Sequence, residues 1–181
     1  VFKLGENLDD IHIIGSPDID VMFSENLPSV ELVKAHYEIK FNEFFIVMFH
    51  PVTTEFGQIN AQSEALVDAL IETGKNFIVI YPNNDLGSDQ ILHHYTKFEN
   101  NPRFRSFPSL RFEYFLVLLK HCKGIIGNSS AGIREAPLFD IPTINIGSRQ
   151  NKRSNGIGSV LNVSPSKEEI FQAILTINNG R

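Results

Sequence analysis

The stretch KGIIGNSSAGIREA, residues Lys123–Ala136, decides the fold class. Its apolar start through Ile126 predicts a buried strand, the small polar run Gly127–Ser130 breaks that pattern, and residues 131–139 can then form a helix. A strand, a small polar turn and a helix start form the geometry that binds phosphate. The first turn of a helix has unpaired N–H groups and lies at the positive end of the helix dipole.

The side chains in this stretch indicate a nucleotide more than a bare anion. Ser129 and Ser130 add hydroxyl donors, and Gly127 lets an anion approach the backbone closely. Glu135 lies about one turn further along, where a carboxylate would repel phosphate but could bind the hydroxyls of a sugar. The alternative is that Asn128 or one of the serines is only a helix N-cap.

Apolar runs alternate with helical periods along the whole chain. The runs predict strands at 11–15, 44–49, 77–81, 103–107, 123–126, 143–146 and 160–163. Helices are expected at 18–23, 29–37, 58–72, 89–99, 111–121, 131–139 and 166–178. Ser166 followed by Glu169 fits a capping box for the last helix.

This alternation predicts an α/β fold, a Rossmann-like parallel sheet with helices on both faces. The strand segments are apolar without polar alternation, as burial on two sides requires. In such sheets ligands bind beyond the carboxyl ends of the strands. The polar residues that directly follow strands should therefore share one edge and form the site: His50, Asn83, Asp85, Asn128, Ser129 and Arg149.

Composition narrows the class without naming a function. The 181 residues, 42% hydrophobic, suit one soluble α/β domain, and the formal charge of −5 argues against nucleic-acid binding through a general basic surface. A local basic strip is present at Arg149, Lys152 and Arg153. Cys122 is the single cysteine, which excludes an internal disulfide.

No membrane segment or signal peptide is expected. The longest apolar runs, such as 44–49, are far shorter than the ~20 residues that span a bilayer. The first ten residues are mixed and charged, so the cytoplasm is the expected compartment. The chain starts at Val1 without an initiator methionine, which suggests a piece of a longer protein.

Four motifs resemble those of the UDP-N-acetylglucosamine 2-epimerase family. They are HPVTTE at His50–Glu55, YPNNDLGS at Tyr81–Ser88, GNSSAGIREA at Gly127–Ala136 and INIGSRQ at Ile144–Gln150. GSPDID at Gly15–Asp20 is similar to the segment that leads into the family's second domain.

The resemblance implies the glycosyltransferase-B plan, in which two Rossmann-like domains face each other across a cleft. Residues 1–181 resemble only the second, C-terminal, UDP-binding domain. The first domain and the final helix that usually crosses back are expected to be missing from this chain.

Within the family, the motifs resemble the hydrolysing branch, which releases N-acetylmannosamine and UDP. A histidine followed by Pro-Val-Thr-Thr resembles the hydrolysing proteins, whereas the non-hydrolysing ones usually carry Arg-Arg-Glu-Asn. GNSS in place of an aspartate-serine-glycine-glycine run indicates the same branch. The implied chemistry is anti elimination of UDP to give a 2-acetamidoglucal, followed by addition of water at C1, with no metal and no cofactor required.

The resemblance also assigns roles to single residues. His50 matches the catalytic histidine near the diphosphate, where it would act on the departing UDP as a neutral donor or as an imidazolium. Ser129 and Ser130 match the phosphate-binding serines, and Glu135 matches the carboxylate that binds the ribose hydroxyls. Without the resemblance, a lone histidine at a strand end would usually be structural.

Three further residues match the family's nucleotide site. Arg149 matches a nucleotide-site arginine, although an arginine after a strand is more often a solvated surface charge. Asn83 matches a nucleotide-contacting asparagine, although the YPNND run could be ordinary turn chemistry. Leu110 should border uracil through its backbone groups. Two other candidates, His93 and His94, are adjacent on a helix and do not share a face, so joint metal binding is not expected.

One departure from the family concerns regulation. The animal bifunctional relatives use a basic group after the PN-x-D-x-G-S turn to bind an activated sialic acid as feedback inhibitor. Asp89 and His93 occupy those places here, so no such feedback is expected, and a bacterial enzyme that supplies N-acetylmannosamine for a sialic-acid-type sugar fits better. The expected partners are UDP, a UDP-N-acetylhexosamine, the missing first domain and a second copy of the full-length enzyme.

Other function classes remain open at this point. A non-hydrolysing 2-epimerase and the donor-binding domain of a glycosyltransferase share the architecture. The glycosyltransferase would be favoured by a second carboxylate eight residues after Glu135, but that position is Thr143. A non-catalytic sugar-nucleotide sensor would be favoured only if the native protein had no first domain.

Overall fold

A six-stranded parallel sheet forms the centre of the computed structural model, which describes residues 4–151, 153 and 156–179. The spatial order of the strands is β3-β2-β1-β4-β5-β6, and every neighbouring pair is parallel. The chain therefore winds outward in both directions from the β1/β4 pair, which makes that pair the switch point where ligands bind in such sheets. The strands are β1 (Phe45–Met48), β2 (Phe77–Ile80), β3 (Phe104–Phe107), β4 (Ile125–Gly127), β5 (Thr143–Ile146) and β6 (Val160–Val163).

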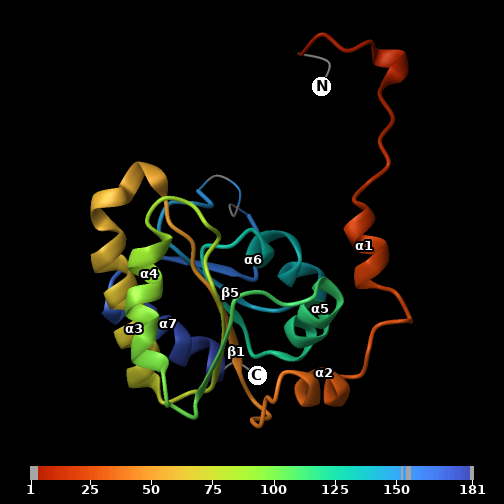
Figure 1. Cartoon of the computed structure of the whole chain (residues 1–181). Coiled ribbons are helices and arrows are strands. Elements are labelled where there is room, and N and C mark those ends of the chain that lie inside the picture. The colour runs from red at the N-terminus through yellow and green to blue at the C-terminus, as the bar shows by residue number, and fades with distance from the viewer. Residues whose placement is uncertain (1–3, 152, 154–155, 180–181) are drawn as a thin grey trace.

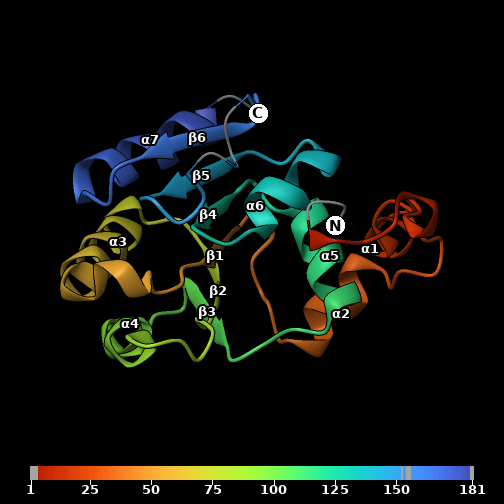
Figure 2. The same ribbon diagram turned by 90° about the horizontal axis from the view of Figure 1, so that it is seen from above.

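Helices cover both faces of the sheet, as Figure 2 shows from above. One face carries α3 (Ile59–Thr73), α4 (Ser88–Tyr95) and α7 (Lys167–Asn179). The other carries α1 (Pro17–Met22), α2 (Val30–His36), α5 (Phe112–His121) and α6 (Ala131–Arg134). Short 3₁₀ helices lie at η2 (Leu8–Asp10), η3 (Thr53–Gln58), η4 (Thr96–Phe98) and η5 (Ala136–Phe139).

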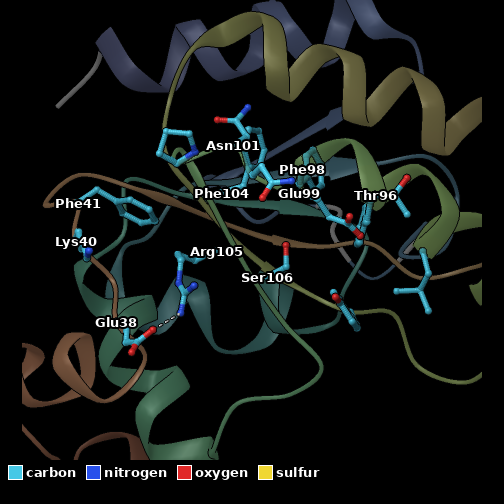
Figure 3. Close-up of a pocket in the computed structure, with 15 residues that line it drawn as sticks. Glu38, Lys40, Phe41, Thr96, Phe98, Glu99, Asn101, Phe104, Arg105 and Ser106 are labelled. Carbon is cyan, nitrogen blue, oxygen red and sulfur yellow. Dashed lines mark hydrogen bonds and ion pairs between the residues drawn. The ribbon is translucent and has the colours of Figure 1, made fainter.

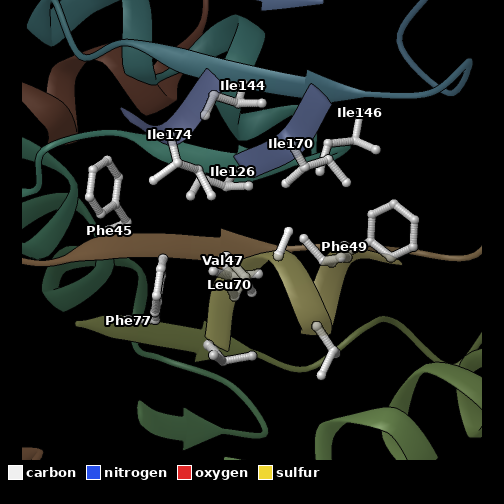
Figure 4. Packing of buried hydrophobic residues seen from close by; sticks show 14 of the residues in the cluster. Phe45, Val47, Phe49, Leu70, Phe77, Ile126, Ile144, Ile146, Ile170 and Ile174 are labelled. Atoms are coloured by element: carbon white, nitrogen blue, oxygen red, sulfur yellow. The ribbon is translucent and has the colours of Figure 1, made fainter. Parts of the chain in front are cut away.

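The core is split by the sheet into two apolar clusters, because successive strand residues point to opposite faces. On β1, Phe45 and Val47 point toward α3 and α7, while Ile46 points toward α5. Figure 4 shows the first cluster, in which side chains of β1, β4 and β5 meet Leu70 of α3 and Ile174 of α7. Each fully buried aliphatic or aromatic side chain contributes roughly 1.5–3 kcal/mol, so the two clusters stabilise the sheet from both faces.

Six of the seven expected strands are confirmed, and the one at 11–15 is wrong. Residues 11–15 form no strand, and Ile13 and Ile14 remain 98% and 81% exposed. Figure 1 shows this segment projecting away from the sheet. The run is apolar enough for a strand, but a strand needs a neighbour to pair with, and the described residues offer none there.

Three helix expectations need correction. The helix expected at 131–139 is two short pieces, α6 and η5, with Pro137 in the second. The helix expected at 89–99 ends at Tyr95 and continues as η4. Only half of the capping box forms: Ser166 Oγ accepts from the Glu169 N–H at 3.3 Å, but the Glu169 carboxylate accepts from the N–H of Ser164 at 2.8 Å instead.

Candidate active site

Asn128 connects the ends of three strands at the carboxyl edge of the sheet. Its side chain is buried and forms two hydrogen bonds to the backbone of His50 after β1: Oδ1 accepts from the N–H at 2.7 Å, and Nδ2 donates to the carbonyl at 2.8 Å. Its own carbonyl accepts from Arg149 Nη1 at 3.0 Å and from Gln150 Nε2 at 2.9 Å, both after β5. Asn128 therefore acts as a clamp between strands, and its side chain is not a helix cap.

Gly127 precedes this clamp and allows β4 to end close to β1. Its φ is +134°, and a Cβ there would lie 2.0 Å from the carbonyl oxygen of Met48. Any side chain would push the two strand ends apart. Glycine at this position therefore serves the strand packing, in addition to leaving room for a ligand.

The His50 ring is fixed through the loop after β2. Its Nδ1 accepts from the backbone N–H of Asn83 at 3.1 Å and also lies 3.2 Å from the side-chain oxygen of Asn83. These two contacts exclude each other, because one ring nitrogen either accepts or donates. A backbone amide is always a donor, so Nδ1 is the acceptor and the proton of the neutral ring is on Nε2. The Asn83 amide in turn donates to the Asp85 carboxylate.

The electrostatic surroundings keep His50 neutral. Burial, followed by the charge of Arg149, lowers the pKa of His50 from 6.5 to about 4, although the Asn83 side-chain oxygen, which would accept from a protonated ring, and the charge of Asp85 act in the opposite direction. In the unliganded protein at neutral pH, His50 is therefore an Nε2–H donor and carries no charge. Of the two forms expected from the sequence, the neutral donor is the one that this environment favours.

Ser129 and Ser130 follow the clamp and are partly exposed, so their hydroxyls are accessible to a ligand. Ser129 Oγ accepts locally from the N–H of Ala131 at 3.3 Å. The helix they open, α6, spans only Ala131–Arg134, so the dipole of a long helix is not available here. Anion binding at this turn would depend on the N–H groups and hydroxyls, a weaker electrostatic contribution than the sequence suggested.

Glu135 follows α6 and is held in a partly dry environment. Burial raises the pKa of its carboxyl group, opposed by the charge of Arg134. One of its oxygens, Oε2, is buried and has no hydrogen-bond partner among the described residues. Arg134 itself lies 3.5 Å from the carboxylate of Asp18. An unpaired carboxylate oxygen in such a place suits hydroxyl donors from a ligand.

Arg149 is part of the cluster, whereas Leu110 is not. The Arg149 guanidinium is partly buried and bonded to Asn128, so it is no freely solvated surface charge. Of its basic neighbours, Arg153 is exposed and Lys152 lies outside the described residues. Leu110 follows β3, an edge strand two positions away from β1, and packs against the apolar cluster that includes residues of α5. Asn83 reaches the cluster through its bonds to His50.

Sequence reasoning missed a second connection at this edge, made by Glu55. Its carboxylate accepts from the Ser148 hydroxyl and from Gln62 Nε2, the latter at 2.9 Å. It thereby ties the loop after β1 to the loop that carries Arg149. Glu55 and Ser148 lie in the motifs HPVTTE and INIGSRQ. Each residue follows a predicted strand, and this position is the sequence signal that could have identified the contact.

The described residues contain no group of three or more histidine, cysteine, aspartate or glutamate side chains arranged to hold a metal ion. None of the described helices is both long and apolar enough to cross a membrane.

The whole chain matches the model of a known protein family. The family model for UDP-N-acetylglucosamine 2-epimerase matches residues 1–181. The chain belongs to this family. A Neisseria meningitidis relative, "UDP-N-acetylglucosamine 2-epimerase", is 49% identical over 172 residues, which is 95% of this chain and 45% of that protein. This chain therefore spans about half the length of the curated relatives that it matches.

Two further relatives carry more specific names. The Escherichia coli "Polysialic acid biosynthesis protein P7" is 35% identical and aligns over 96% of this chain and 45% of its own length. A Campylobacter jejuni "GDP/UDP-N,N'-diacetylbacillosamine 2-epimerase (hydrolyzing)" is 31% identical over 84% of this chain and 41% of its own length.

A solved 2-epimerase structure shares the fold. The Methanocaldococcus jannaschii UDP-GlcNAc 2-epimerase in complex with UDP-GlcNAc and UDP superposes with a TM-score of 0.73 at 17% identity. The match covers 99% of this chain and 51% of that chain. The sheet described above therefore has the fold of about half of that 2-epimerase chain.

Proposed function

We propose that this 2-epimerase chain is the UDP-binding, C-terminal domain of a hydrolysing UDP-N-acetylglucosamine 2-epimerase. In that role residues 1–181 form one Rossmann-like half, and a first domain of the same protein closes the site. The carrying observation is the cluster at the β1/β4 switch point, where Asn128 holds the backbone of His50 and the Arg149 guanidinium and directly precedes the Ser129–Ser130 turn. A neutral donor, a cation and free hydroxyls at one sheet edge suit a diphosphate.

The UDP moiety would lie across this edge. Ser129 and Ser130 would bind the diphosphate, Arg149 would offset its charge, and Glu135 would accept from the ribose hydroxyls. Leu110, at the β3 end, would border uracil. This assignment gives the unpaired Glu135 oxygen hydroxyl donors and lets the partly exposed serine hydroxyls donate to the phosphate.

His50 would assist the first chemical step, anti elimination of UDP. As the C1–O bond breaks, the electron pair goes to the β-phosphate oxygen, and the His50 Nε2–H donates to that growing charge. The proton at C2 leaves to a base in the first domain, and a 2-acetamidoglucal remains. Water then adds, with hydroxyl at C1 and a proton at C2, to give N-acetylmannosamine. No metal or redox cofactor is needed for these steps.

Two observations favour hydrolysis over interconversion of the two UDP-sugars. HPVTTE and GNSS have the form typical of the hydrolysing branch, and a hydrolysing relative is among the similar proteins. The similarity to a polysialic acid biosynthesis protein supports a role in making a sialic-acid-type sugar, in the cytoplasm where nucleotide sugars are made. A glycosyltransferase would be favoured by a carboxylate at position 143. That position holds Thr143, which is buried in β5 and donates to the carbonyl of Gly132 at 2.6 Å, so this alternative is less favoured.

Product analysis on the full-length protein tests the reaction. Incubation with UDP-N-acetylglucosamine should release UDP together with free N-acetylmannosamine. Proton NMR identifies the two products. Accumulation of UDP-N-acetylmannosamine would instead establish the non-hydrolysing reaction, and transfer of the sugar to an added acceptor would establish a glycosyltransferase.

Binding to this chain alone tests the UDP site. We expect UDP to bind weakly, with a Kd on the order of tens of micromolar to millimolar, because the contacts of the first domain are missing. Glu135→Ala should weaken UDP more than inorganic diphosphate, since only UDP has ribose hydroxyls to lose. Calorimetric titration of both ligands measures the difference, with Glu168→Ala on α7 as control. Equal losses for both ligands would remove Glu135 from the ribose.

A further inference from the structure

A second cavity lies along the open edge of the sheet, beside β3. Its volume is about 630 Å³, within the roughly 300–1,000 Å³ typical of small-molecule sites. Its walls come from β3, the end of α4 with η4, the loop 99–102 and residues 38–41 before β1, as Figure 3 shows. None of its lining residues belongs to the His50 cluster.

One wall of this β3-edge cavity is a rigid stack of aromatic rings. Phe98 stacks on Phe104 with 4.2 Å between ring centroids and 9° between planes. Phe104 stacks in turn on Phe77 at 5.1 Å, and Tyr95 packs against Phe98 at 5.2 Å. All four side chains are at least nine-tenths buried. A wall fixed in this way loses little conformational freedom when a ligand binds.

The charges around the cavity cancel. Glu38 and Glu99 are matched by Lys40 and Arg105, and Arg105 already lies 3.5 Å from the Glu38 carboxylate and donates to the Tyr37 carbonyl at 2.9 Å. The remaining polar lining consists of neutral groups that both donate and accept hydrogen bonds: Tyr81, Tyr95, Thr96, Asn100, Asn101 and Ser106. Such a lining gives no net attraction to an anion and suits a neutral ligand with many hydroxyls.

Two polar atoms in the wall lack partners among the described residues. Tyr95 Oη and Arg105 Nε are buried and form no hydrogen bond. A buried polar group left without a partner costs about 1–3 kcal/mol. Small side-chain rotations toward a ligand that supplies hydroxyl oxygens would relieve this cost, and both atoms can donate to such oxygens.

The edge strand itself is poorly suited to a peptide. β3 has four residues and is followed by Pro108, while Pro102 stands just before Arg103. A short edge strand, flanking prolines and a charged side chain are the features that block addition of another strand. The cavity is therefore suited to a compact molecule and not to an extended chain.

We infer that the β3-edge cavity binds a free, neutral sugar at a site separate from the nucleotide site. A pyranose ring presents an apolar C–H face to Phe41 and Tyr81, the partly exposed aromatic residues of the lining, and its hydroxyls donate to and accept from the amide and hydroxyl groups of the rim. The balanced charges give no net attraction to the diphosphate of a nucleotide sugar, which the His50 cluster suits better, so the two ligands would occupy different sites. The inference does not depend on the reaction proposed above.

Amide NMR of the ¹⁵N-labelled chain, already saturated with UDP, tests this inference. Titration with N-acetylmannosamine or N-acetylglucosamine should give saturable shifts in residues 38–41 and 96–106, in the millimolar range. Glucuronate, a sugar of similar size with a negative charge, should bind at least about tenfold more weakly, a difference of 1.4 kcal/mol. Failure of both neutral sugars to shift these amides, or equal binding of glucuronate, overturns the inference.

Two variants locate the site. Ser106→Phe fills the cavity and should weaken the sugar at least about tenfold while UDP binding stays unchanged. Glu99→Ala removes one exposed carboxylate of the rim, which cannot compromise the fold, and should weaken the sugar by about threefold, near the lower range of a hydrogen bond. Glu168→Ala on α7 is the matched control. Sugar shifts that persist unchanged in both cavity variants place binding elsewhere and overturn the inference.

Discussion

His50 is defined by the groups around it more than by its own chemistry. The Asn83 N–H occupies Nδ1, burial and Arg149 keep the ring neutral, and Asn128 holds its backbone. Together these constraints leave the Nε2–H as the donor of a ring that is held in place. A donor that is already oriented needs no reorganisation as charge develops, which is why it can lower a barrier.

Removing this donor should therefore affect the rate more than binding. In the full-length enzyme, His50→Ala should lower kcat by roughly 10²- to 10⁴-fold, while UDP affinity changes much less because the contact strengthens only as UDP departs. Steady-state kinetics and a UDP titration measure the two effects. Hydration of a supplied 2-acetamidoglucal should be spared. Near-normal turnover, or loss of activity through unfolding alone, would make the histidine structural.

The lowered pKa of His50 makes stability depend on pH. The unfolded chain binds a proton to His50 below pH 6.5, whereas the folded chain does so only near pH 4, so this histidine costs stability as pH falls through that window. Between pH 7 and pH 5, the free energy of unfolding of the His50→Gln variant should therefore fall by about 1–2 kcal/mol less than that of the parent chain. Urea unfolding at the two pH values measures this change in the free energy of unfolding. The control is His12→Gln, in the exposed N-terminal segment. An equal pH dependence in all three proteins would contradict the assigned environment.

At the scale of elements, the site depends on how β4 ends. The β4 strand approaches the carbonyl of Met48 so closely that only glycine fits at position 127, and the clamp residue Asn128 follows immediately. The helix after it is a single turn. The geometry of this edge therefore comes from strand packing and side-chain clamps, and only to a small extent from a helix dipole.

Gly127→Ala should destabilise the fold by roughly 3 kcal/mol or more, because the added Cβ meets backbone and not a movable side chain. Gly158→Ala makes the same chemical change where nothing lies within 4 Å, and it should stay within about 0.5 kcal/mol of the parent. Urea unfolding of both variants gives the comparison. Similar stability of the two variants would mean that the β1/β4 approach is looser than described.

At the scale of the whole molecule, the candidate site lies open along one edge of the sheet. The switch point between β1 and β4 faces outward, with Ser129, Arg149 and His50 all partly exposed along it. The match to about half of its relatives' length agrees with a site that a second domain completes.

This chain alone should show no turnover of UDP-N-acetylglucosamine. The family resemblance places the acid/base carboxylates in the first domain, and an open half-site does not exclude water from the reacting bond. A coupled assay for UDP release, with the full-length protein as positive control, checks this. Measurable release by the purified 181-residue chain, beyond a heat-inactivated sample, would refute it.

The sequence by itself determined the alternation of strands and helices and the edge where polar residues gather. Both are local properties: two-sided burial makes strands continuously apolar, and parallel strands place their carboxyl ends together. For that reason His50, Asn83, Asn128 and Arg149 could be assigned to one edge before any contact was known. The four motifs also indicated the 2-epimerase family, because their residues and spacing recur in its members.

Only the tertiary structure decided how these residues act on one another. That Asn128 clamps His50, that the ring is neutral, and that Glu55 joins two loops all depend on contacts between segments far apart in the chain. The segment 11–15 depends on the tertiary structure in the same way. Its apolar residues are typical of a strand, but no described strand lies beside it to pair with. Local pattern specifies what a segment can form, whereas pairing, burial and pKa depend on what the fold brings beside it.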